Sequence, residues 1–147
     1  MSTLTASATG HSRQAGRSVI AIAAALVANV VLSVGTDQIL HVLGIYPPWG
    51  QPMYDTSLNA LALGYRIVFG IASGYLVARL APHTPMRHAT ILGIIAVVLS
   101  TLGAVAAITQ ADLGPAWYPI LLVIVAYPCV WLGAVLHRRR HGIMPAR

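Results

Sequence analysis

Charged side chains are scarce in this chain, and two of the usual kinds are absent. The 147 residues include no lysine and no glutamate, and nine arginines and three aspartates make up the charged 8%. A soluble domain carries about 25% charged residues. With 57% hydrophobic residues and a mean hydropathy of +0.75, the composition excludes an ordinary soluble domain and indicates an integral membrane protein.

Cysteine is nearly absent as well. The single Cys129 excludes an internal disulfide and a two-thiol redox mechanism. It lies in an apolar run, where a buried cysteine behaves as a small hydrophobic residue. The sequence has no dinucleotide, phosphate-loop or zinc-ligand spacing, so we expect no cofactor and no metal. The arginines flank apolar runs, which favours a role in membrane topology over nucleic-acid binding.

Four apolar runs are long enough to cross a bilayer and predict an all-α transmembrane four-helix bundle. Pro47 and Pro48 are expected to end the first run, and Pro85 to open the third. Pro128 lies inside the fourth run, where it removes a backbone hydrogen bond. The expected spans are approximately residues 18–45, 57–81, 86–109 and 115–136.

The segments that flank the spans differ in charge. We expect residues 1–17 to be a disordered tail, residues 18–137 the membrane domain and residues 138–147 a basic tail. Eight of the nine arginines lie in the two tails and around the second loop, and none lies in the first or third loop. The positive-inside rule therefore predicts that both termini are cytoplasmic. The arginines expected to set this topology or to hold lipid headgroups are Arg79, Arg87, Arg138, Arg139 and Arg140.

Aromatic side chains gather beside the two loops that lack arginine. The amphipathic rings of tryptophan and tyrosine favour the level of the lipid headgroups. Their position is consistent with a membrane boundary at these loops. The expected interfacial aromatics are Tyr46, Trp49, Tyr54, Trp117 and Tyr118.

Polar residues recur every fourth position in the first apolar run. Asn29, Ser33, Asp37 and His41 fall on one face of a helix, and we call this series the polar ladder. An aspartate at the bilayer centre costs about 2.5–3.5 kcal/mol on insertion scales. Asp37 therefore needs a partner or a wet cavity.

One basic residue lies at a matching depth in the second run. Asp37 and Arg66 are equally distant along the chain from the centre of the first loop, so an antiparallel hairpin brings them to the same level. Arginine offers five donors in a planar fork that suits a carboxylate. We predict an Asp37–Arg66 ion pair, with Tyr65 beside it and His41 one turn further toward the loop.

Two interpretations of this cluster stay open. A buried ion pair can fix helix register and select one bundle out of several. Alternatively, Asp37 and His41 can pass or sense a proton or bind a polar ligand. An imidazole that is simply hydrogen-bonded to Asp37 would fit the first interpretation.

Several short motifs are spread over about residues 20–136. They are Asp37 with His41, PPWGQPM at 47–53, Tyr65-Arg66, ARLAP at 78–82, PMRHA at 85–89 and PAWYP at 115–119. Together these motifs resemble a family of small uncharacterised bacterial membrane proteins with four predicted spans. The resemblance implies a bacterial plasma-membrane location and brings no activity or catalytic residues. The small multidrug resistance transporters differ, because here the acid lies late in the span, Arg66 is added and the arginine bias is strong.

The leading interpretation is a small non-enzymatic membrane protein with a structural or accessory role, whose Asp37, His41 and Arg66 cluster fixes the bundle or binds a small polar ligand. One alternative is a proton-coupled transporter or channel subunit that acts as an oligomer. Another is a membrane enzyme that acts on a lipid or quinone. The expected partners are membrane lipids and either further copies of the chain or another membrane protein, and not nucleic acid.

Overall fold

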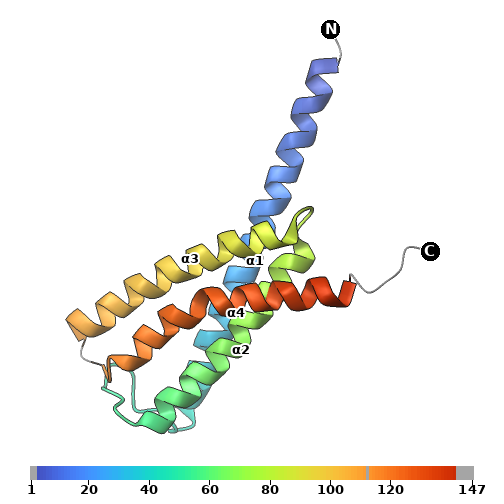
Figure 1. Ribbon diagram of the computed structural model, residues 1–147. Helices are drawn as coiled ribbons and strands as arrows, with labels where there is room; N and C mark the ends of the chain where they lie inside the picture. Colours follow the sequence, from blue (N-terminus) through green and yellow to red (C-terminus); the bar gives the residue numbers. More distant parts are fainter. Residues whose placement is uncertain (1–2, 112, 142–147) are drawn as a thin grey trace.

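The protein folds as four packed α-helices, each long and apolar enough to span a membrane. The computed structural model describes residues 3–111 and 113–141, with side chains for 16–109 and 113–140. This confirms the predicted all-α class and the presence of four helices that are long and apolar enough to span a membrane. The predicted orientation, with both termini cytoplasmic, stays a prediction. The helices are α1 (Thr3–Val42), α2 (Thr56–Leu80), α3 (Pro85–Ala106, continued by the π-helical segment Ala107–Ala111) and α4 (Trp117–His141) (Figure 1).

Helix α1 is longer at its start and shorter at its end than the sequence predicted. It begins at Thr3 rather than Ser18, and its apolar part, Gly16–Val42, is the candidate membrane span. The N-terminal part projects beyond the bundle (Figure 1). Gly44, with φ +70°, ends the helix, because the Ile45 N–H reaches back to the Leu40 carbonyl at 3.0 Å. The helix therefore stops before the proline pair at 47–48.

The other boundaries follow local signals. Asp55 caps α2 by accepting from the Ser57 and Leu58 N–H groups at 2.8 and 3.1 Å. Pro85 opens α3 as predicted, and α4 begins two residues after its predicted start, at Trp117. We call the end that contains residues 43–55 and 113–116 the loop end of the bundle, and the end that contains residues 81–84 the turn end.

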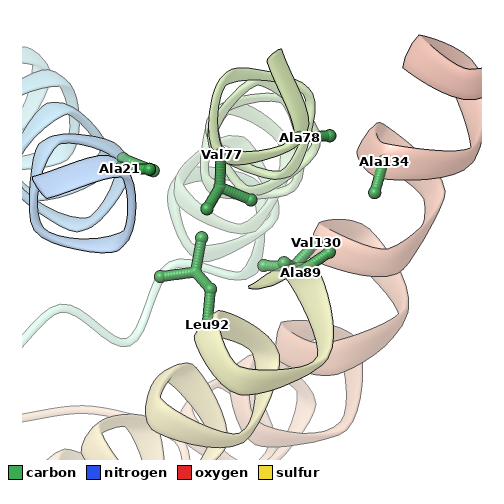
Figure 2. Close-up of a cluster of buried hydrophobic side chains, with 8 residues drawn as sticks. Ala21, Val77, Ala78, Ala89, Leu92, Val130 and Ala134 are labelled. Atoms are coloured by element: carbon green, nitrogen blue, oxygen red, sulfur yellow. The ribbon is translucent and has the colours of Figure 1, made fainter. Parts of the chain in front are cut away.

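The hydrophobic core lies at the turn end. Val77 of α2 and Leu92 of α3 are the largest fully buried side chains, and they point toward one another (Figure 2). Ala21 of α1 closes one side, and Val130 and Ala134 of α4 close the other. Because most of these side chains are small, all four helices approach closely here. The bundle is therefore packed at the turn end.

Two glycines bring α2 and α4 into backbone contact. A Cβ on Gly74 would clash with the Val130 carbonyl, and a Cβ on Gly133 would clash with the Ile71 carbonyl and lie 2.6 Å from the Tyr75 nitrogen. The sequence places Gly70 and Gly74 in a small-xxx-small pattern, which permits such an approach. The α2–α4 crossing therefore depends on glycine.

We expect Gly133→Ala to destabilise the bundle by about 1–3 kcal/mol, because the added methyl group has no room. The measurement is the midpoint of thermal unfolding in detergent. Gly64→Ala is the control, since a Cβ there meets nothing within 4 Å. Equal midpoints for Gly133→Ala and the wild-type protein would contradict the proposed close crossing.

Candidate functional site

An ion pair joins α1 to α2 near the loop end. Arg66 Nη2 donates to Asp37 Oδ2 at 2.6 Å, as the sequence predicted. Tyr65 donates its hydroxyl to Asp37 Oδ1, so both carboxylate oxygens have a donor. Arg66 Nη1 donates to the Tyr118 hydroxyl at the start of α4. The guanidinium group therefore connects three helices.

The pair is largely removed from the molecular surface. The Asp37 side chain is 13% exposed and the Arg66 side chain 28% exposed. Arg66 also lies beside the rings of Tyr65 and Tyr118, with its Cζ 5.4 and 5.8 Å from the ring centroids. Either charge alone would be costly within a membrane span, and the pairing offsets much of that cost.

The His41 side chain is hydrogen-bonded to the first loop. Its Nδ1–H donates to the Pro47 carbonyl at 2.6 Å, and its ring lies 4.0 Å from the Trp49 ring and 5.5 Å from the Tyr46 ring, between centroids. Trp49 in turn donates Nε1–H to the Gln38 Oε1 at 3.1 Å. The sequence left open a hydrogen bond from His41 to Asp37, and the imidazole instead makes this contact with the loop.

Hydrogen bonds from backbone and side-chain amide groups connect the segments of the loop end. The sequence did not predict these bonds. Asn59 of α2 is buried and donates Nδ2–H to the carbonyls of Met53 and Asp55, both at 2.8 Å. The Met53 N–H donates to the Leu113 carbonyl at 2.8 Å, which links the first and third loops. Burial raises the pKa of Tyr46, whose hydroxyl donates to the Leu58 carbonyl at 3.4 Å.

Behind these loops the helices line a partly open cavity of about 610 Å³. The whole polar ladder lines it, together with Arg66. The opposite wall is formed by α3 and α4 and is mainly apolar, with small residues such as Ala96, Ser100 and Gly103 on α3. The volume lies within the range of ligand pockets, about 300–1,000 Å³. The ion pair is thus the polar end of a cavity with apolar walls.

Asn29 lies two turns deeper on the ladder than Asp37. Its Oδ1 is buried and, within the described residues, accepts no hydrogen bond. Asn29 lines the cavity, but this oxygen has almost no accessible surface there. Ser33 lies between the two and also faces this space.

Other residues predicted from the sequence lie elsewhere. Trp117 contacts the Tyr118 ring edge-on at 6.1 Å, and Tyr54 is exposed on the first loop. Neither lines the cavity, whereas Tyr46 and Trp49 do. The predicted topology arginines are at or near the helix ends away from the ion pair, namely Arg79, Arg87, Arg138, Arg139 and Arg140.

No family model, curated protein or solved structure matches this chain. The resemblance to small bacterial four-span proteins therefore depends on the sequence motifs alone. The structure supports one part of this resemblance, namely the four long apolar helices.

A double-mutant cycle tests the ion pair. We expect Asp37→Asn and Arg66→Leu each to lower the unfolding midpoint in detergent, because each leaves one buried charge without its partner. The double variant should recover part of the loss, with a coupling energy of about 1–3 kcal/mol.

Arg79→Leu is the matched control for this cycle. Arg79 lies on the same helix, about 20 Å from Arg66 along its axis at 1.5 Å per residue. The decrease in unfolding midpoint caused by Arg79→Leu should simply add to the decrease caused by Asp37→Asn. Additive effects of Asp37→Asn and Arg66→Leu would contradict a stabilising pair.

Proposed function

We propose that this chain is a small non-enzymatic membrane protein with a structural or accessory role, whose Asp37–Arg66 cluster fixes the bundle and binds a polar group in the cavity. The observation that carries the proposal is the position of the ion pair at one end of a large cavity. A pair that acted only in packing would not need an open space beside it. Three N–H groups of Arg66 remain for a ligand, since its hydrogen bonds within the described residues use two of five.

The structural part of the role follows from where the cluster lies. The turn end has a close-packed core, whereas the loop end is hollow. There the hydrogen bonds from Arg66 connect α1, α2 and α4 across the hollow. The cluster therefore supports the part of the bundle that has the least packing.

The closed turn end favours a binding cavity over a pore. The cavity reaches Leu26 and Val130, where the hydrophobic core begins. Beyond that point Ala21, Ala25 and Val77 are buried with at most 1% exposure. A proton-coupled transporter would need a second conformation in which this core opens. We therefore rank the transporter as the alternative function.

We also propose a bacterial plasma-membrane location with both termini cytoplasmic. The support is the arginine bias in the sequence and the four apolar helices. In this orientation the loop end and the ion pair lie toward the outer leaflet.

Thiol labelling tests whether polar molecules reach the cavity when no lipid ligand competes for it. In a Cys129→Ala background in nanodiscs that contain phospholipid alone, Ser33→Cys should react with a small water-soluble thiol reagent faster than Val27→Cys does. Ser33 lines the cavity, whereas Val27 is 59% exposed on the same helix and does not line it. Equal or slower labelling of Ser33→Cys would contradict the proposed polar binding cavity.

Proton flux separates the proposed function from the transporter. We expect liposomes that contain the protein and an internal pH dye to leak protons no faster than empty liposomes, because the core closes the cavity at the turn end. Flux above that level in the wild-type protein, lost in folded Asp37→Asn, would favour the transporter instead.

A further inference from the structure

The cavity opens sideways, toward the space that lipid occupies around a membrane helix. Val30 and Val34 of α1 line the cavity and are nevertheless 49% and 54% exposed. Leu99 and Ile108, on the α3 side, line it and are 49% and 45% exposed. These four side chains therefore lie at the rim of an opening between α1 and α3. In a bilayer, acyl chains and not water lie beside this opening.

The contents of the cavity must suit apolar walls. Filling about 610 Å³ with water would take about 20 molecules at 30 Å³ each. Most of them would contact apolar side chains of α3 and α4, where a water molecule finds too few hydrogen-bond partners. From His41 to Leu26 the cavity extends about 22 Å along α1, at 1.5 Å per residue. This length suits a hydrocarbon chain with a polar head.

The charges of the site indicate an uncharged head. Asp37 and Arg66 cancel one another, so an anionic head would add an unbalanced charge within a membrane span. The N–H groups of Arg66 that remain need acceptors, such as carbonyl or hydroxyl oxygens.

Beside these N–H groups the chemistry is reversed. Each Asp37 oxygen accepts one hydrogen bond within the described residues and can accept another, which a hydroxyl group supplies and a quinone carbonyl does not.

We propose that the cavity binds an uncharged lipid whose head carries both carbonyl and hydroxyl oxygens, as acylglycerols do, and that this lipid reaches Arg66 and the polar ladder through the opening between α1 and α3. This inference rests on the proposed binding function and names the class of ligand. The lipid need not cross water, because the opening faces the bilayer.

Photo-crosslinking in nanodiscs tests this inference. The probe is a monoacylglycerol with a diazirine in its acyl chain, and the adduct is located by peptide mass spectrometry. We expect adducts on residues that line the cavity, and we expect unlabelled monooleoylglycerol to compete for them. Lysophosphatidate with the same acyl chain, which differs by a charged phosphate, should not compete.

Two glycine variants provide a matched pair. Gly103 lines the cavity and Gly64 does not, and a Cβ on either meets nothing within 4 Å. Gly103→Leu should narrow the cavity and reduce the yield of adducts, whereas Gly64→Leu should leave the yield unchanged. Both variants should retain the unfolding midpoint of the wild-type protein to within a few degrees, which shows that a lost adduct is not a lost fold.

The possible results separate this inference from the proposed function. An undiminished yield of adducts in Gly103→Leu, or equal competition by lysophosphatidate or by a short-chain quinone, would overturn the inference. Fast labelling of Ser33→Cys without lipid adducts would overturn the inference and leave the polar binding cavity intact. Slow labelling of Ser33→Cys without adducts would overturn both.

Discussion

One ion pair joins the helices around the cavity at the loop end of this bundle. Asp37 and Arg66 approach within 2.6 Å, and the same guanidinium group donates to Tyr118, so α1, α2 and α4 share one polar centre. The opposite end needs no such centre, since small side chains pack there around Val77 and Leu92. The ion pair therefore keeps α1, α2 and α4 in a defined arrangement around the cavity. A hollow with a polar end and apolar walls is what an amphiphile requires.

The sequence predicts much of this architecture because the relevant signals are local or symmetric. Four apolar runs specify four helices by length alone. The Asp37–Arg66 contact follows from equal chain distances to a loop, which is a one-dimensional property of any antiparallel hairpin. The stacking of the polar ladder on one face follows from the helical repeat.

The remaining features depend on how helices diverge in space. Tyr118 was predicted only as an interfacial aromatic, because no spacing relates α4 to the first hairpin. The helical repeat predicts His41 one turn from Asp37, but the partner of the imidazole depends on the loop, which folds back and brings the Pro47 carbonyl to it. The end of α1 is set by Gly44, which can adopt a positive φ, and not by the proline pair at 47–48. The cavity itself has no sequence pattern, since the small residues of α3 could equally have formed a tight helix contact.

Solid-state NMR on the protein in bilayers gives the most direct test of the ion pair. The measurement is the dipolar coupling between a labelled aspartate carboxyl carbon and labelled arginine guanidinium nitrogens. We predict a coupling typical of direct contact, consistent with the 2.6 Å between Nη2 and Oδ2, and its loss in Asp37→Asn. A folded wild-type protein without this coupling, or with a coupling that persists in Asp37→Asn, would contradict the account.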